Sequence, residues 1–549
     1  MGNSLCTADQ VAEEKTEEQL PNLLEAFDLR PDDMLARKAK ARSNFADDAY
    51  PLAPSDSRVT TVAPTDSRVA TMNELTCTST MSEESARTLS AHEACPVAMT
   101  SSMCVQVASL PATESQSDGQ RIFVVANGKS GGNAASEFLT IPKEGYRYSE
   151  GTSNALVFAY DVRDRQCYDH LAAAVAAAAP SERVLVIVAG GDGTVMWVIE
   201  ELFNAEIPTE RLAIGTVPFG TGNDFANVTR WGSTGPSGRF LKEQDGWSGL
   251  QNFVRRWLQA EHRNFDIWAL SIKTKGSNKA GFHFIEDGMK VCTDDHIARH
   301  RIKKLPGGEL EMSKYMCNYF SIGVDARIGV GFDKHRTNSQ LGNKAVYAYE
   351  GAKKFAKKKG VIANILEDMK ELPADVPFNT ADEESDSAAT KNETTIFTTA
   401  RGNALPQIKG NPISLIFMNI PSIAAGLDIW RYSSKKMGIT GSNELLKARQ
   451  DFGDGHIECL AYRSSLGFLL EQLKSPMTLS GRGGRVHSGK GPYRLTFKDP
   501  SSAEYRRGTD HCKGRIYMQV DGEYFIVYEM SSVFLRHHRS ITVLVATEL

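Results

Sequence analysis

The chain has 549 residues, of which 41% are hydrophobic and 24% charged, and its formal net charge is −4. This length allows two to four domains with sizeable cores. The nearly balanced charge gives no global positive field, so we expect no nucleic-acid partner. The nine cysteines include no C-x-x-C pair, which argues against zinc-finger modules and favours free thiols in a reducing compartment.

Residues 1–118 differ from the rest of the chain in composition. They are rich in Ser, Thr, Ala, Glu and Asp and poor in aromatic residues. Such a segment buries too little apolar surface to offset the entropy of ordering, so we expect a disordered N-terminal arm. The start, MGNSLC, has neither the basic nor the apolar region of a secretory leader, and we therefore predict a cytoplasmic protein.

Residues 119–265 alternate between apolar strands and helices. Strands are predicted at 121–126, 156–161, 183–189 and 211–218, and helices at 167–179 and 195–204. The strands are continuously apolar, as expected for a parallel sheet covered by helices on both faces. The most apolar helical run, 171–179, is too short to span a bilayer. We predict an α/β nucleotide-binding lobe here.

From residue 266 to the end the pattern becomes strand-rich. Segments such as FDIWALSIK, YFSIGVDARIGVGF, ISLIFMNI, YRLTFK and GRIYMQVDGEYFIVY carry β-branched and aromatic residues between turn signals. These predict a second, mainly antiparallel β-rich lobe over 266–549. Residues 372–406 interrupt it with a polar stretch, which we expect to be an inserted surface loop.

Three glycine-rich loops follow strands of the α/β lobe. They are NGKSGGN at 127–133, GGDGT at 190–194 and GTGND at 220–224. Ligands of open parallel sheets bind at the carboxyl ends of the strands, where all three loops lie. Glycines let the backbone approach a phosphate, and the next helix N-terminus supplies N–H donors. One such loop could be an ordinary turn, but three predict a nucleotide site.

Neither common nucleotide motif fits these loops. A Walker loop ending in the GKS of 128–130 would need glycine where Phe123 stands, and a G-x-G-x-x-G starting at Gly191 would need glycine where Met196 stands.

The combination of NGKSGGN, GGDGT-x-x-W-V and VPFGTGNDFA resembles the catalytic domain of the diacylglycerol kinase family. The resemblance continues in NKAVYAYEG, FMNIPSIAAGLDIW, DGHIECLAY and MQVDGEYF, which are similar to the family's accessory domain. Together these matches cover about 121–235 and 315–545. The resemblance implies transfer of the γ-phosphoryl of ATP, with Mg²⁺, to the hydroxyl of diacylglycerol in a membrane, giving phosphatidic acid for lipid signalling.

The loops supply the expected nucleotide-binding residues. These are Asn127, Lys129, Ser130, Gly131, Gly132, Gly190, Gly191, Gly193, Thr194, Gly220, Thr221, Gly222, Asn223 and Asp224. Backbone N–H groups would cradle phosphates, and Lys129 would add a point charge. Thr194 is also suited to cap the following helix, and Thr221, Asn223 and Asp224 to bind the nucleotide or to cap.

Two aspartates are candidates for the chemistry. Asp192, a lone acid among glycines, could bind Mg²⁺ or act as the base. By resemblance, Asp454 in the DGHIE motif is a second candidate for the base, although the DFGDG sequence also suits a simple turn. An EF-hand at this stretch is excluded because the upstream oxygen ligands are missing. The first loop also departs from the family, with Gly128 where proline is usual.

A kinase for diacylglycerol must reach a membrane, and the sequence offers two routes. Gly2 could be myristoylated and Cys6 palmitoylated, although residue 6 is not the preferred Ser or Thr. Basic clusters at 299–304 and 353–359 could bind anionic lipid or be solvated helix ends. Cys292, His296 and His300 have helical spacing for a zinc site, but a fourth ligand is missing.

Three other functions remain open. A sphingosine or ceramide kinase shares GGDGT, but the long downstream matches argue against it. An NAD kinase would need neither the accessory matches nor a membrane arm. A catalytically inactive lipid-binding scaffold is opposed by the intact GGDGT.

Overall fold

The structure is a computed structural model that describes most of the chain beyond residue 118. The described residues are 119–284, 300–335, 346, 350, 360–375, 393–400, 406–408, 411–423, 426–431, 433, 445–464, 483–509 and 514–547. The predicted disordered arm, Gly2, Cys6, Cys292, His296 and the basic cluster 353–359 lie outside them.

The α/β lobe is built on a parallel core of four strands in the order β3-β1-β4-β5. Their bounds are Ser153–Asp161 for β3, Gln120–Ala126 for β1, Val184–Gly190 for β4 and Leu212–Pro218 for β5. Every residue of β4 and β5 is buried, because helices and loops cover both faces. A further strand, β2 (Tyr146–Glu150), pairs antiparallel with β3 at the edge.

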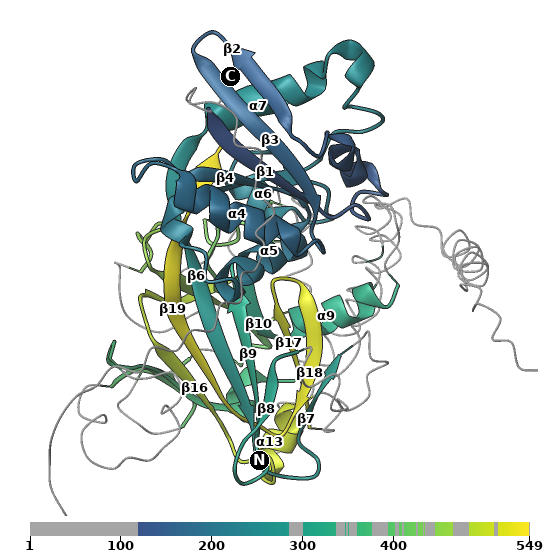
Figure 1. The fold of residues 1–549 in the computed structure, drawn as a ribbon. Helices are drawn as coiled ribbons and strands as arrows, with labels where there is room; N and C mark the ends of the chain where they lie inside the picture. The colour runs from purple at the N-terminus through teal and green to yellow at the C-terminus, as the bar shows by residue number, and fades with distance from the viewer. Residues whose placement is uncertain are drawn as a thin grey trace, which may run out of the picture. The chain divides into compact units, whose positions relative to one another are not determined.

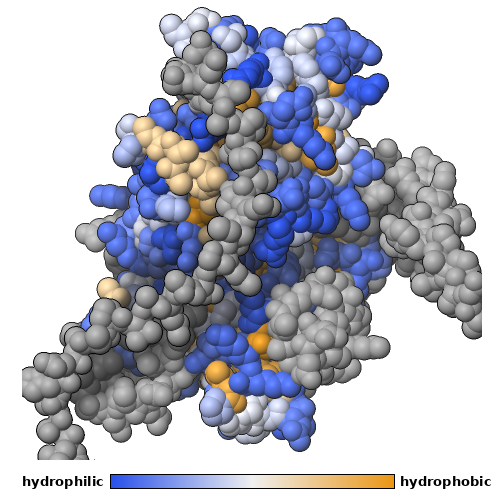
Figure 2. All heavy atoms as spheres, in the orientation of Figure 1, coloured by the Kyte–Doolittle hydropathy of each residue, from blue (hydrophilic) through white to orange (hydrophobic). Residues whose placement is uncertain are grey.

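Helices flank the core strands, and those predicted at 167–179 and 195–204 are among them. They are η1 (Ala134–Thr140), α4 (Gln166–Ala177), α5 (Asp192–Asn204), α6 (Asp224–Val228) and α7 (Ser248–Leu258). The apolar stripe of α5 packs its Val195, Val198, Ile199 and Leu202 into the core. Beyond its first turn, α4 exposes alanines, and a pale orange patch lies over it on an otherwise mostly hydrophilic face (Figure 2).

Two long strands carry this sheet into the second lobe (Figure 1). The strand β6 (Glu261–Thr274) pairs antiparallel with β19 (Met530–Val545) along almost its whole length, and β19 also pairs parallel with β5. The sheet therefore has 12 described strands in both lobes. Its remaining members are β8 (Ile302–Lys304), β9 (Leu310–Met316), β11 (Leu366–Glu371), β12 (Thr394–Thr398) and β16 (Tyr493–Phe497).

A second sheet of seven described strands, all antiparallel, faces the first. Its order is β15 (Gly484–Gly489), β14 (Ile457–Tyr462), β13 (Ser414–Met418), β10 (Tyr319–Gly323), β17 (Arg515–Val520), β18 (Glu523–Tyr528) and β7 (Gly281–Phe284). The largest apolar core contains residues of both sheets, such as Trp268 and Phe417. The predicted fold class, a parallel α/β part followed by an antiparallel β part, is confirmed.

Two predicted elements differ from the structure. The segment YFSIGVDARIGVGF, which reads as strand throughout, forms β10 and then the helix α9 (Val324–Asp333). Eight of the ten residues of α9 are buried, so the sequence has no polar face to reveal the helical period. Within 372–406, expected to be an inserted loop, Thr394–Thr398 form β12, with Ile396 and Phe397 buried. Two short helices, α11 (Ile362–Ile365) and α13 (Ala503–Gly508), also lie in this lobe.

Candidate active site

The three glycine-rich loops meet at the carboxyl edge of the parallel core. The amide of Asn127 donates to the carbonyl of Ala189 at 3.0 Å, and that of Phe219 to the carbonyl of Gly190 at 2.8 Å. The side chain of Asn127 also donates to the Thr194 hydroxyl at 3.3 Å. The structure therefore brings together the ends of β1, β4 and β5, as expected for a single ligand site.

Two glycines of these loops are required by backbone contact between the loops. A Cβ on Gly191 would come within 2.8 Å of the Gly220 Cα, and one on Gly220 within 2.6 Å of the Gly191 Cα. Gly131 has a φ of +62°, and a Cβ there would lie 2.8 Å from the Phe219 ring. These glycines are therefore needed for the close packing of the loops themselves, apart from any role in ligand binding.

Other glycines leave open space instead. A Cβ on Gly132 or Gly193 would have no heavy atom within 4 Å, and both residues are exposed. Lys129, three residues before Gly132, is also exposed, and its backbone amide donates to the Asn127 side-chain oxygen at 3.4 Å. The exposed amides and the lysine are therefore placed where an anionic group can approach from solvent.

Asp192, the first residue of α5, lies at the start of α6. Its Oδ1 accepts from the Phe225 amide at 2.8 Å and from the Asn318 side chain at 3.2 Å, and its Oδ2 accepts from the Asp224 amide at 3.2 Å. A negative charge at a helix N-terminus is stabilising. Since a carboxylate offers about four lone-pair positions, three of those of Asp192 are already in use.

The third loop has two buried polar side chains, one of which contacts the second lobe. Asn223 is buried, and its side chain bonds to the amide and carbonyl of Gly220 and to the carbonyl of Ser233. Asp224 is also buried, and its carboxylate accepts from the Ser422 hydroxyl at 2.5 Å. Neither side chain reaches solvent at the edge, whereas Thr221 and Gly222 are half-buried there.

Helix capping by Thr194 is not observed. Gly191 is the N-cap residue of α5 and has no side-chain cap, whereas Thr194 lies in the first turn with its hydroxyl accepting from Asn127. Its hydroxyl and methyl groups fill the space that a Cβ on Gly190 would need, at 2.6 and 2.7 Å. Thr194 therefore joins the first and second loops.

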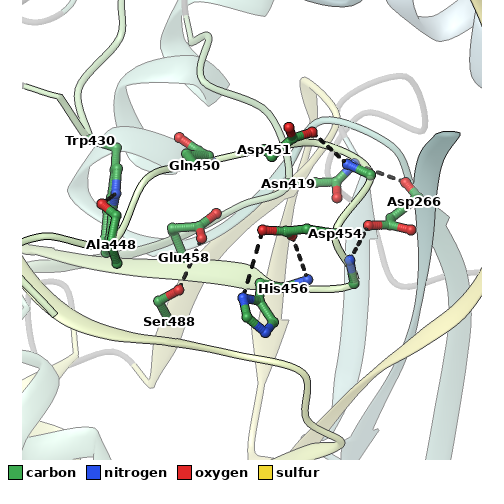
Figure 3. Close-up of polar contacts among 12 residues, drawn as sticks. Asp266, Asn419, Trp430, Ala448, Gln450, Asp451, Asp454, His456, Glu458 and Ser488 are labelled. Atoms are coloured by element: carbon green, nitrogen blue, oxygen red, sulfur yellow. Dashed lines mark hydrogen bonds and ion pairs between the residues drawn. The ribbon is translucent and has the colours of Figure 1, made fainter. Parts of the chain in front are cut away.

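Asp454 lies in a tight turn before β14 (Figure 3). Its Oδ1 accepts from the amide of His456 at 2.9 Å, its Oδ2 is 3.7 Å from the His456 Nδ1, and the side chain is 36% exposed. The turn rests on β6, because the Asp266 amide donates to the Phe452 carbonyl at 2.7 Å. A Cβ on Gly453 would come within 2.2 Å of the Asn264 carbonyl oxygen. Asp454 therefore presents an accessible carboxylate oxygen from a fixed turn.

Buried asparagines connect the two aspartates. Asn318 donates to Asp192, and its carbonyl accepts from the Asn419 amide at 2.9 Å. The Asn419 side chain donates to the Asp266 carbonyl at 2.8 Å, and the Asp266 carboxylate accepts from the Gly455 amide at 2.6 Å. A continuous hydrogen-bonded chain thus runs from the second glycine loop to the turn of Asp454.

Asp521 fixes Asn318 in place. Its carboxylate, in the turn between β17 and β18, accepts from the amides of Cys317, Asn318 and Tyr319 at 2.7–2.9 Å. Burial raises the pKa of Asp521 to about 6, against the opposite effect of these backbone hydrogen bonds.

A second buried acid lies four residues after Asp454. Burial raises the pKa of Glu458 to about 8; the Ser488 hydroxyl opposes this shift, and the charge of Asp454 adds to it. The Oε2 of Glu458 and the Oε1 of Gln450 have no hydrogen-bond partner in the described part of the chain. A proton retained on Glu458 therefore avoids an unpaired buried charge.

Sequence analysis did not identify Asp266, Asn318, Asn419, Asp521 or Glu458 as site residues. Each is a single polar residue within or beside an apolar strand. Buried polar side chains are almost always hydrogen-bonded, so such isolated residues are the signal that would have pointed to a network. Their partners, however, lie up to 274 residues away and cannot be read from local patterns.

The candidate zinc ligand His300 and the basic cluster 299–304 lie partly among packed or paired side chains. His300 is buried and stacks on Phe284, with ring centroids 3.5 Å apart, rather than facing outward on a helix. No cluster of three metal-ligating side chains occurs among the residues that the structure describes. In the cluster 299–304, Arg301 pairs with Glu200 at 3.3 Å, while Lys303 and Lys304 are exposed within strand β8.

Asp192 fits a magnesium ion as one ligand among several. Mg²⁺ is usually held by one or two carboxylates together with substrate phosphates and waters. Asp192 retains about one lone-pair position on Oδ2, next to the exposed Gly193.

The fold and the site define a two-lobed α/β protein with glycine-rich loops of the nucleotide-binding kind. Residues 121–241 match the diacylglycerol kinase catalytic domain, and residues 315–524 match the diacylglycerol kinase accessory domain. The chain belongs to the diacylglycerol kinase family. The resemblance found in the sequence is thereby confirmed.

Curated relatives agree with these matches. Probable diacylglycerol kinase 3 of Caenorhabditis elegans is 25% identical over 65% of this chain and 38% of its own length. Diacylglycerol kinase iota of Mus musculus is 25% identical over 73% and 29%, and the eye-specific diacylglycerol kinase of Drosophila melanogaster 33% identical over 32% and 10%. The chain thus spans about two fifths or less of the length of these relatives. Every helix among its described residues is too short or too polar to cross a bilayer.

Proposed function

We propose that the chain is an ATP-dependent diacylglycerol kinase that makes phosphatidic acid. The observation that carries this proposal is the hydrogen-bonded chain that joins the second glycine-rich loop to the turn that presents the carboxylate of Asp454. Phosphoryl transfer depends on positioning and charge stabilisation more than on covalent chemistry, and this arrangement supplies both.

In this proposal the two aspartates have different tasks. The Oδ2 of Asp454 accepts the proton of the lipid hydroxyl while the hydroxyl oxygen forms a bond to the γ-phosphorus of ATP. The bond from that phosphorus to the bridging oxygen breaks, and ADP leaves with the electron pair. Asp192 orients the start of α6 and contributes one ligand to Mg²⁺, which when bound neutralises phosphate charge.

The nucleotide is proposed to lie along the exposed part of the loop edge. The amides around Gly132 and Gly193, together with Lys129, face solvent there and suit the phosphates. Asn127 and Thr194 hold the first and second loops in register. Buried Asn223 and Asp224 support the edge from beneath.

A radiolabel assay tests the activity. The full-length protein is incubated with Mg²⁺, [γ-³²P]ATP and diacylglycerol in mixed micelles, with sphingosine and ceramide in parallel. We expect label in phosphatidic acid and little in the other lipids. Label mainly in a sphingoid lipid would favour the sphingosine or ceramide kinase alternative. Equally low transfer by wild type and Asp192→Ala would favour an inactive scaffold.

Membrane attachment is proposed to be peripheral and to involve acylation of Gly2 and Cys6, with anionic lipid binding by basic residues such as Lys303 and Lys304 as a second contribution. Labelled myristate should enter the wild-type protein but not Gly2→Ala, and the variant should shift from the membrane to the soluble fraction. An unchanged membrane fraction would rule out this anchor.

A further inference from the structure

A cluster of three side chains lies behind the turn of Asp454. The Asp266 carboxylate, with no exposed surface, accepts from the Ser540 hydroxyl at 2.6 Å and lies 2.9 Å from the His537 Nε2, both through Oδ1. Its Oδ2 accepts from the Gly455 amide at 2.6 Å. All three residues lie outside the segments that match the two family domains, 121–241 and 315–524.

A β-bulge in β19 makes this cluster. Ser540 pairs directly with Asp266, and His537 pairs with Trp268 two residues further along β6. Residues three apart normally face opposite sides of a strand, but the register shifts between His537 and Arg539. The extra residue places His537 on the same face as Ser540, and bulges commonly redirect a side chain in this way.

The bulge also fixes the orientation of the imidazole. The Trp268 ring lies edge-on to His537, with centroids 5.6 Å apart and an interplanar angle of 83°. Trp268 is itself held by a hydrogen bond of 3.0 Å from its indole to Asn419, a member of the chain that connects the two lobes. With the ring held in this way, Nε2 must carry a proton to donate to the carboxylate.

We propose that His537 and Ser540 are positioning residues that hold the Asp266 carboxylate so that its second oxygen fixes the Gly455 amide and hence the direction of Asp454. This inference rests on the proposed function, in which Asp454 accepts the lipid proton. Hydrogen bonds to a buried carboxylate are short and directional, so the loss of one donor lets the carboxylate turn and the neighbouring amide shift. A misplacement of about 1 Å at the base is enough to slow transfer strongly.

The test compares two substitutions at His537 in the full-length protein. His537→Leu removes the donor, whereas His537→Gln retains a side-chain N–H. With Mg-ATP and diacylglycerol in mixed micelles, we expect kcat of the Leu variant to fall by about tenfold or more, with KM for ATP within about twofold of wild type. The Gln variant should recover most of kcat. Ser540→Ala, a smaller change, should lower kcat less than His537→Leu.

A structural readout and a control accompany the kinetics. Hydrogen exchange of the peptide 451–457 should be faster in His537→Leu than in wild type, because the Gly455 amide loses its fixed acceptor. His262→Leu is the matched control, since His262 is an exposed residue of the same strand pair, opposite Leu544 and without contact to Asp266. It should change neither exchange nor kcat.

A double-mutant cycle with Asp454→Asn separates this inference from the proposed function. If His537 acts through Asp454, His537→Leu should not lower the residual single-turnover rate of Asp454→Asn any further. The positioning role alone would be overturned if His537→Leu lowered the single-turnover rate equally in wild type and in Asp454→Asn. It would also be overturned if His537→Leu were fully active while Asp454→Asn was impaired. Full activity of Asp454→Asn would instead contradict the assignment of the base, and this inference with it.

Discussion

At the end of β4, Asp192 accepts from N–H donors with both carboxylate oxygens. In the turn before β14, Asp454 contacts the amide and, at 3.7 Å, the imidazole of His456, and its side chain is 36% exposed. The first region is assembled from loops in backbone contact. The second is a single turn held from behind by Asp266. The acid of the GGDGT motif is thus largely engaged in joining loops, whereas in the proposed mechanism the turn DFGDG presents the carboxylate that receives the proton.

Replacing Asp192 should have the largest combined effect. Asp192→Ala leaves the amides of Asp224 and Phe225 and the side chain of Asn318 without their acceptor. Each unsatisfied buried donor costs about 1–3 kcal/mol. We expect the free energy of unfolding, measured with denaturant, to fall by a few kcal/mol together with the loss of kinase activity. Loss of activity at unchanged stability would mean that Asp192 acts only in the chemistry.

On the Asp454 side, Glu458 should make stability depend on pH. Since its folded pKa is raised from 4.5 to about 8, the folded state retains a proton that the unfolded state loses. Its contribution is therefore fully present below about pH 4.5 and is lost as the pH rises through about 8, by up to a few kcal/mol. In Glu458→Gln the thermal midpoint should fall less between pH 5 and pH 9 than in wild type. Identical pH profiles would contradict a buried, protonated Glu458.

Gly220 tests whether loop contact shapes the edge. In Gly220→Ala the new Cβ would lie 2.6 Å from the Gly191 backbone, so one loop must move. Overpacking of this kind costs about 1–3 kcal/mol. We expect a lower thermal midpoint and a higher KM for ATP, because the second and third loops separate. A thermal midpoint equal to that of wild type would show that the two loops can move apart at little cost in stability.

Gly193 provides the opposite case, with the smallest expected effect on stability. A Cβ there meets nothing within 4 Å, and the residue lies in the first turn of α5. Gly193→Ala should stabilise the fold by up to about 0.5–1 kcal/mol, yet raise KM for ATP several-fold by blocking the backbone. An unchanged KM for ATP would indicate that the phosphates do not bind next to the Gly193 amide.

The sequence predicted the shared edge of the three glycine-rich loops well, because its parts are local. Each loop directly follows an apolar strand, and the carboxyl ends of parallel strands share one edge. The connection between the lobes could not be predicted in this way. The pairing of β19 with β5, the bulge at His538 and the contacts of Asn318 join segments far apart in the chain. Helix α9 was missed because burial on all sides removes the helical period.

The most direct test of the central claim is the single-turnover rate of Asp454→Asn at saturating Mg-ATP and diacylglycerol. Asparagine can still accept the His456 amide, so the turn and the thermal midpoint should be retained. General-base catalysis contributes about 10²–10⁴-fold, and we predict a fall of at least about a hundredfold with the Kd for ATP unchanged. A rate within twofold of wild type would contradict the assignment of Asp454 as the base and would leave Asp192 as the candidate for that role.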